Sequence, residues 1–239
     1  MNAKPQQTPP RVPPLSRLTV AETALRLLNE GGLDKLTLRA IAQELDVKAP
    51  ALYWHFKNKQ ELIDEMATEM FRRMATDLGP GPDAETADGA GAPGAADGSP
   101  PPWRERMLLA NRGLRRALLA YRDGARVFTG SRFTNTEHAR QSEAYLQALT
   151  AQGFALPQAV RAMTTTFSYT LGFVIEEQGV HPVPGERREG YDVAERGERL
   201  AGYPLAAAAG EHLFQEYDEH FEEGLQIVLD GIAARYGIR

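Results

Sequence analysis

Large apolar residues recur every three or four positions along most of the chain, which is the period of an amphipathic α-helix. Thr19 and Glu22 have the spacing of a capping box, so a first helix is predicted to begin there, and two glycines at 31 and 32 favour its end. Thr37 can cap a short second helix, and a third helix begins at Ala49. The pattern therefore predicts a helix, a tight turn and a helix before residue 57.

The same period continues through the rest of the chain. Asn58 with Glu61 can cap a fourth helix. No segment alternates apolar and polar residues as a half-buried strand does, so the predicted fold class is all-α. Further helices are expected at 103–122, 134–152, 157–177, 204–216 and 218–236, with a short segment at 123–130 and a polar loop at 179–202.

Two stretches lack the large apolar residues that a folded core requires. Residues 1–16 hold five prolines, and residues 79–102 contain no aromatic or branched aliphatic residue. Neither stretch can offset the entropy lost on ordering its backbone. We therefore expect a disordered N-terminal arm and a flexible insertion.

Charge is divided unevenly along the 239 residues, although the formal net charge is only -5. Residues 1–59 carry nine Lys and Arg against five Asp and Glu, so the remaining 18 basic residues face 27 acidic ones. A basic end on an acidic body is expected when one end meets phosphates. The chain has no cysteine and no run of about 18 apolar residues, so we expect a cytoplasmic protein without a membrane partner.

The segment PALYWHFKNK, residues 50–59, places aromatic residues beside lysines. In a helix-turn-helix the second helix enters the major groove while flanking residues hold phosphates. Leu52, Trp54 and Phe56 are expected to face the core; alternatively, all the aromatics are core and the lysines a solvated face. The predicted DNA-binding residues are Thr37, Arg39, Lys48, Ala49, Pro50, Ala51, Tyr53, His55 and Lys59, with Lys59 at the positive start of the fourth helix.

LTLRAIAQELDVKAPALYWHFKNKQELID, residues 36–64, resembles the DNA-binding signature of the TetR family of one-component bacterial transcription regulators. One departure is Asp46, where the family usually has glycine in the turn; Asp visits the left-handed region more readily than most residues. YRDGARVFTGSRF, AQGFALPQAVRAM and YTLGFVIEEQ look like the ligand-binding domain of the tetracycline repressors. The resemblance covers most of residues 18–236.

This resemblance implies a homodimeric repressor that binds a palindromic double-stranded DNA operator and is released by a small-molecule effector. It divides the chain into a helix-turn-helix domain at 17–60 and a ligand-binding and dimerisation domain at 61–239. The helices at about 157–178 and 218–236 would pair with a second subunit. On the last helix, the stripe expected to dimerise is Phe221, Leu225, Val228 and Ile232.

The resemblance transfers only part of the tetracycline site. The histidine that binds magnesium in those repressors is Phe128 here, and the polar residues that grip the drug fall on Ala75 and about Ala110. Glu176 matches a carboxylate that reaches the site from the partner subunit. We therefore expect an aromatic or polycyclic effector without magnesium, and no cofactor. The predicted site, in which Ser131 and Arg132 match a threonine and an arginine of that family, is Leu114, Phe128, Ser131, Arg132, Phe133, Met163, Phe167, Ser168, Phe173 and Glu176.

Three other interpretations stay open. The protein could still be a repressor that responds to magnesium and tetracycline together. An enzyme could use Glu176, Glu177 and Ser168 for hydrolysis, although no nucleophile has an adjacent base. An architectural DNA-binding protein is the third, although the body is larger than dimerisation requires. The histidines outside the head, which are His138, His181, His212 and His220, are expected on the solvated surface.

Overall fold

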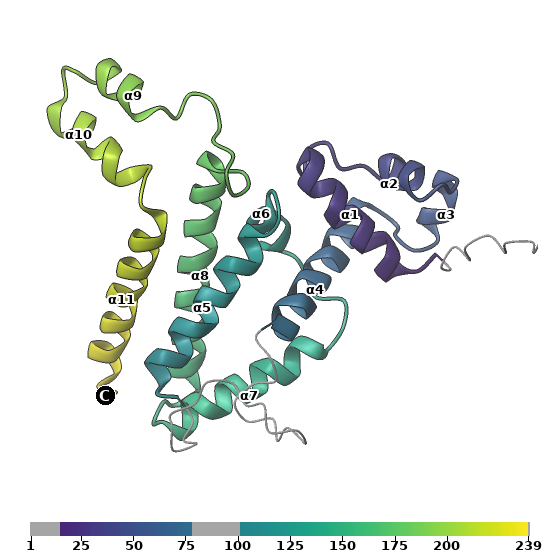
Figure 1. The fold of residues 1–239 in the computed structure, drawn as a ribbon. Coiled ribbons are helices and arrows are strands. Elements are labelled where there is room, and N and C mark those ends of the chain that lie inside the picture. Colours follow the sequence, from purple (N-terminus) through teal and green to yellow (C-terminus); the bar gives the residue numbers. More distant parts are fainter. Residues whose placement is uncertain (1–14, 78–100, 239) are drawn as a thin grey trace, which may run out of the picture.

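The computed structural model describes residues 15–77 and 101–238, which form eleven α-helices and no strand (Figure 1). The all-α prediction is therefore confirmed. Most of the predicted arm and insertion lies outside the described residues. The parts that are described are ordered: Ser16 caps the first helix, and Pro101 is buried and accepts a hydrogen bond from Gln152 Nε2 at 3.2 Å.

The N-terminal head consists of α1 (Arg17–Gly31), α2 (Leu38–Glu44) and α3 (Ala49–Tyr53), packed on the first turns of α4 (Lys59–Asp77). In Figure 1 these purple and blue helices stand apart from the body, and α4 leads from one to the other. The fully buried residues of the head include Val20, Leu25, Leu28, Ile41, Leu52 and Phe56. They belong to an apolar cluster that continues through α4 to Leu114 and Phe128 of the body.

The ends of the head helices follow from local hydrogen bonds. The cap of α1 is Ser16 and not Thr19: the Ser16 hydroxyl accepts from the Thr19 backbone N–H at 3.1 Å. Gly32 ends α1 with a φ of 79°, which glycine adopts without strain. The predicted caps of the later helices are confirmed, since Thr37 Oγ1 accepts from Ala40 N and Asn58 Oδ1 accepts from Glu61 N.

The body is built on three long helices that lie side by side (Figure 1). α8 (Leu156–Val180) packs against α5 (Trp103–Leu119) and against α11 (Tyr217–Tyr236). The short α6 (Gly124–Phe128) lies between α4, α5 and α8, and α7 (Glu137–Ala151) crosses the end of the body. In the part of the chain that the structure describes, no helix has the length and hydropathy of a membrane span.

The segment predicted as a polar loop at 179–202 contains a helix. α9 (Val193–Arg199) begins after Asp192, whose carboxylate accepts from the Glu195 N–H at 2.9 Å. The Asp192 and Glu195 pair has the three-residue spacing of a helix start, so the signal was present in the sequence. α9 packs on α10 (Pro204–Leu213), and the two helices project from the body in Figure 1.

The apolar stripe of α11 faces the interior of its own chain. Phe221, Leu225 and Ile232 are buried with residues of α5, α7 and α8, and Val228 packs against the same cluster. The prediction that this stripe forms the dimer surface is therefore wrong, because these side chains complete the core of one subunit. Ile227 is instead 64% exposed on the opposite face.

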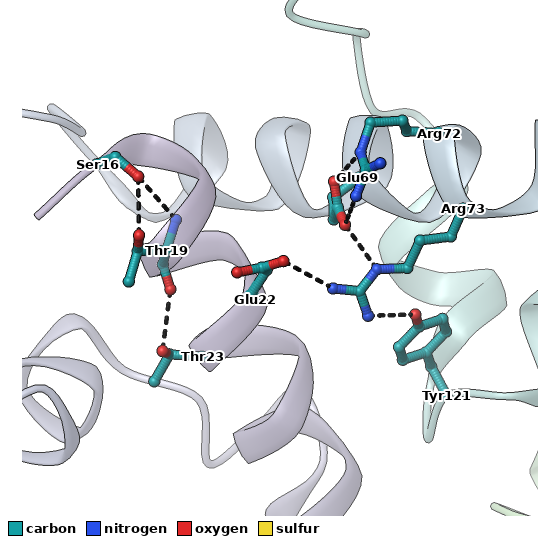
Figure 2. Close-up of polar contacts among 8 residues, drawn as sticks. All are labelled: Ser16, Thr19, Glu22, Thr23, Glu69, Arg72, Arg73 and Tyr121. Carbon is teal, nitrogen blue, oxygen red and sulfur yellow. Dashed lines mark hydrogen bonds and ion pairs between the residues drawn. The ribbon is translucent and has the colours of Figure 1, made fainter. Parts of the chain in front are cut away.

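An ion-pair network around the buried Glu69 connects the head to the body through α4. Glu69 is almost fully buried, and its carboxylate accepts from Arg72 and from Arg73 Nε at 2.6 to 2.7 Å. Figure 2 shows that Arg73 also reaches Glu22 of α1 at 3.4 Å and the Tyr121 hydroxyl, beyond α5, at 3.1 Å. Arg73 therefore joins three parts of the chain at one point.

We expect Gly224→Ala to destabilise the body by about 1 to 3 kcal/mol, because it overpacks the contact between α8 and α11. A Cβ at Gly224 would lie 2.2 Å from the Tyr169 hydroxyl, whose ring stacks on Phe221 and cannot move away freely. Urea unfolding measures the change. Gly231→Ala is the matched control, since nothing lies within 4 Å of its added Cβ; equal effects of the two substitutions would contradict the packing argument.

Glu69→Gln should destabilise the protein by about 1 to 3 kcal/mol at neutral pH. Burial alone would raise the pKa of the Glu69 carboxyl, but the hydrogen bonds and charges of Arg72 and Arg73 together outweigh burial and lower the pKa. The ionised form is thus favoured in the folded state, so its stabilisation is present above about pH 4.3 and lost as pH falls through the folded pKa.

Denaturant unfolding from pH 7 to pH 3 tests this expectation. The gap in unfolding free energy between the native protein and Glu69→Gln should narrow in acid. Glu30→Gln serves as control, because Glu30 pairs with Arg26 on the exposed surface and contributes little. A gap that stays constant with pH would rule out the proposed role of the Glu69 charge.

Candidate functional sites: a DNA-reading head and an aromatic core

The predicted DNA-binding residues gather on α2, α3 and the adjoining turns. Arg39 is exposed in the first turn of α2, and Lys48, Pro50 and Tyr53 are exposed at and along α3. The hydroxyl of Thr37 is exposed and caps α2. The other three predicted residues of the α3 region, which are Ala49, Ala51 and His55, are half-buried.

The turn between α2 and α3 has the geometry that a helix-turn-helix requires. Asp46 adopts φ 52°, so the expectation that this residue takes a left-handed conformation is confirmed. The turn is closed by hydrogen bonds from Asp46 N to Gln43 O at 3.2 Å and from Val47 N to Ala42 O at 2.9 Å. α3 is thereby held across the end of α2.

One core prediction in the head is wrong. Leu52 and Phe56 are fully buried, but Trp54 is 90% exposed. α3 ends at Tyr53, so Trp54 lies in the turn that follows and its ring leaves the core. Tyr53 and Trp54 therefore present neighbouring aromatic side chains on the surface of the head.

Lys59 and Arg17 form hydrogen bonds that connect separate segments of the head. Lys59 is exposed, and its ammonium donates to the Leu33 carbonyl at 2.9 Å, in the loop after α1. Arg17 donates to the His55 carbonyl and to Glu65 of α4 at 2.7 Å, and its guanidinium lies 4.4 Å from the Phe56 ring centroid. Sequence reasoning missed Arg17, which holds the end of α3 against α4.

The structure brings part of the predicted effector site together as an aromatic core. Phe133 lies 5.6 Å from Phe128 and 4.9 Å from Phe71 of α4, between ring centroids. Phe128 in turn lies 6.3 Å from Phe167 of α8. Leu114 of α5 is buried in the same apolar cluster.

Other predicted site residues lie elsewhere. On the α11 side of the body, the ring centroid of Phe173 lies 5.3 Å from that of Phe221, and the ring centroid of Tyr169 lies 5.7 Å from it. Ser168 and Glu176 are exposed on α8, and Met163 is half-buried. The buried carboxylate is the neighbouring Glu177, which receives two hydrogen bonds from Arg115 at 2.7 and 2.9 Å.

His138 belongs to the aromatic core, so its assignment to the solvated surface is wrong. Its ring lies 4.9 Å from the Phe133 ring, and its Nδ1 is buried without a hydrogen-bond partner. His181 and His220 are half-buried, and only His212 is exposed as expected. A histidine at the start of an amphipathic helix gives no signal of which neighbour it meets.

The aromatic core does not fit a magnesium ion. Phe128 packs its ring against Phe133, and Ser131 donates its hydroxyl to the Val127 carbonyl at 2.6 Å. Magnesium prefers carboxylate, carbonyl and water oxygens in an octahedron. Within residues 15–77 and 101–238, no three His, Asp or Glu side chains come together as a metal ion requires.

Two buried polar side chains of α4 hold the segment that carries Phe133. Asp64 Oδ1 accepts from the Arg132 backbone N–H at 3.1 Å, and Thr68 Oγ1 accepts from the Thr134 N–H at 2.9 Å. Buried polar groups without such partners would be costly. The position of Phe133 and the position of α4 therefore depend on each other.

The turn between α5 and α6 contacts the head directly. The Asp123 carboxylate accepts from Leu33 N at 2.8 Å, and Arg122 N donates to Asn29 Oδ1 at 2.8 Å. Asp123 has φ 57° and leads into Gly124, where a Cβ would lie 2.1 Å from the Leu118 carbonyl. α6, which carries Phe128, is thus connected to the end of α1.

Comparison with known proteins matches each half of the chain to a described family of domains. Residues 20–66 match the family described as bacterial regulatory proteins, tetR family. Residues 97–236 match the tetracyclin repressor-like C-terminal domain. The tetracycline repressor protein class A from transposon 1721 of Escherichia coli is 37% identical over 221 residues, which are 91% of this chain and 90% of that protein.

Solved structures agree with these matches. A possible TetR family transcriptional regulator from Streptomyces coelicolor has a TM-score of 0.72 and 37% identity, and the match covers 92% of this chain and 99% of that one. A class A TetR in complex with 5a,6-anhydrotetracycline and magnesium has a TM-score of 0.61 and 33% identity, over 90% of this chain and 96% of that one. The chain therefore belongs to the tetR family of bacterial regulatory proteins and is a ligand-responsive transcriptional repressor.

Proposed function

We propose that two copies of this protein bind a palindromic DNA operator in the bacterial cytoplasm and release it when an aromatic effector enters the body. The exposed surface of α3, with Lys48, Pro50 and Tyr53 on a closed helix-turn-helix, is the observation that carries the DNA-binding part. A helix so placed can enter the major groove while basic and aromatic neighbours hold phosphates. No enzymatic activity is proposed.

The effector part rests on the aromatic core and its hydrogen bonds to α4 and the head. A flat molecule between Phe128, Phe133 and Phe167 would displace the rings that α6 and its following turn carry. Those segments are bonded to Asp64 and Thr68 of α4 and, through Asp123, to the loop after α1. An effector that prefers the displaced arrangement shifts the population away from the DNA-bound one.

The dimer is proposed to form through the outer faces of α8 and α11. Val160 and Ile175 are exposed along α8, and Ile227 is exposed on α11. Exposed apolar residues on two adjacent long helices are typical of a helix-bundle interface between subunits. A two-fold axis there would place the two heads at successive half-sites.

We expect Arg39→Ala to weaken specific operator binding by about 1 to 3 kcal/mol, if Arg39 contacts a guanine. The operator is first selected from a library of palindromic duplexes, and binding is then measured by electrophoretic shift at fixed salt. Gln43→Ala is the control, because Gln43 is exposed on the same helix and has no predicted DNA contact. Selection of no common sequence would contradict the proposed function.

Ile227→Glu should convert the dimer to monomers that remain folded, because it places a charge on the proposed interface. Sedimentation velocity and far-UV circular dichroism together show the result. Leu225→Glu is the contrasting variant: Leu225 is fully buried in its own chain, so this substitution should unfold the body. An Ile227→Glu protein that sediments as a dimer would place the interface elsewhere.

Effector release should not require magnesium. The Phe128 ring fills the position at which the resembled repressors have their metal-binding histidine, and a chelate there would leave charge unpaired among aromatic rings. Tetracycline and a panel of aromatic polyketides are titrated against the operator complex with and without EDTA. Release by tetracycline that depends on magnesium would reverse this assignment and favour the magnesium-tetracycline alternative.

A further inference from the structure

Arg106 of α5 is a buried cation without a partner. Its side chain belongs to the interior of the body, and the residue is only 6% exposed. Both Nε and Nη2 are buried and make no hydrogen bond. In the described part of the chain, no carboxylate forms an ion pair with it, whereas Arg104, Arg112 and Arg115 of the same helix all have one.

The two unpartnered nitrogens form the edge of the guanidinium that binds carboxylates elsewhere in this protein. Arg72, Arg112 and Arg115 each hold a glutamate through Nε and Nη2, with distances between 2.6 and 2.9 Å. This pair of parallel N–H groups matches the two oxygens of a carboxylate. Arg106 presents the same pair to the interior of the body.

Arg106 lies about two turns before Leu114 on α5, on the face that leads to the aromatic core. Arg106, Ala110 and Leu114 follow one another at four-residue spacing on α5, so they lie along one face of that helix. Leu114 is part of the cluster that contains Phe128 and Phe133. A flat ligand in that cluster could therefore extend along α5 towards Arg106.

Two further polar groups lie near this end of the body. Burial raises the pKa of the Tyr145 hydroxyl, and the nearby charge of Arg106 opposes that shift, so Tyr145 stays a neutral donor and acceptor at pH 7. Trp103, one turn before Arg106 on α5, has a buried indole N–H without a partner. The region therefore holds unused hydrogen-bond donors.

We propose that Arg106 binds a carboxylate, or a planar anion of the same shape, on the effector, and hence that the effector is an aromatic acid. This inference rests on the proposed function for the role of the aromatic core. A buried guanidinium without a counterion destabilises the empty protein, and a ligand that supplies the counterion removes that cost on binding. Arg106 then selects acids over neutral molecules of the same shape.

The test uses a matched pair of probes, anthracene-2-carboxylate and anthracene-2-carboxamide, which differ in charge and share their aromatic rings. Affinities are measured by isothermal titration calorimetry at pH 7, where the acid is ionised. The native protein should bind the carboxylate at least about tenfold more tightly than the carboxamide. Arg106→Met should remove this preference and leave carboxamide binding unchanged.

Arg116→Met is the control for a lost positive charge, because Arg116 is exposed on the same helix. It should keep the full preference for the carboxylate. Equal affinity of the native protein for the two probes, binding of neither probe, or an unchanged preference in Arg106→Met would overturn the inference.

Thermal unfolding without any probe gives a second, independent measurement. If Arg106 has no partner in the empty protein, Arg106→Met should melt at the same temperature or higher; a fall of several degrees would show an internal partner and overturn the inference. Release of operator DNA separates the two proposals. A carboxylate that binds through Arg106 but leaves the operator bound would confirm the anion site and contradict its role in induction.

Discussion

The burial of polar side chains on α4 is the constraint on which the arrangement of this protein depends. Asp64, Thr68 and Glu69 lie on the buried face of one helix, and each needs hydrogen-bond partners that water cannot supply. Asp64 and Thr68 accept from backbone N–H groups of the segment after α6. Glu69 is paired with Arg72 and Arg73 of α4 itself, and Arg73 also reaches Glu22 of α1 and the Tyr121 hydroxyl. An apolar α4 could slide against the body at small cost. In the observed arrangement these groups have their partners, and α4 is also bonded to the head through Arg73 and Glu22.

The same contacts connect the aromatic core to the head that carries the helix-turn-helix. The rings of Phe128 and Phe133 are carried by short segments that bond to α4 through backbone N–H groups and to the loop after α1 through the Asp123 carboxylate. Packed interiors transmit displacement because they contain little free volume. Buried charges in the body are of two kinds, those with an ion-pair partner and those without one. Arg115 and Glu177 neutralise each other and hold α5 to α8, whereas Arg106 has no such partner and remains available to a ligand.

The sequence correctly predicted those features that depend on residues close together in the chain. The helical period gave the all-α class, glycine marked the end of α1, and Asp46 took the left-handed turn conformation. It failed where a residue's surroundings come from distant parts of the chain. The stripe of α11 was identified as apolar, but periodicity cannot say whether an apolar face meets its own subunit or another. Trp54 was assigned to the core because the end of a five-residue helix was not visible in the pattern. His138 and Arg106 were missed as interior groups because polar residues carry no signal of burial.

The separation of buried from exposed residues in and next to α3 has a consequence for how this repressor can evolve. The residues that fold the head, Leu52 and Phe56, point inward, while Lys48, Pro50 and Tyr53 are exposed and take part in no core packing. Substitutions at the exposed positions should therefore cost little stability. Under the proposed function, they change which bases are read. The lineage of such a protein can acquire a new operator through a few surface changes while the interior that responds to the effector is retained. Operator sequence and effector chemistry are thus free to diverge at different rates.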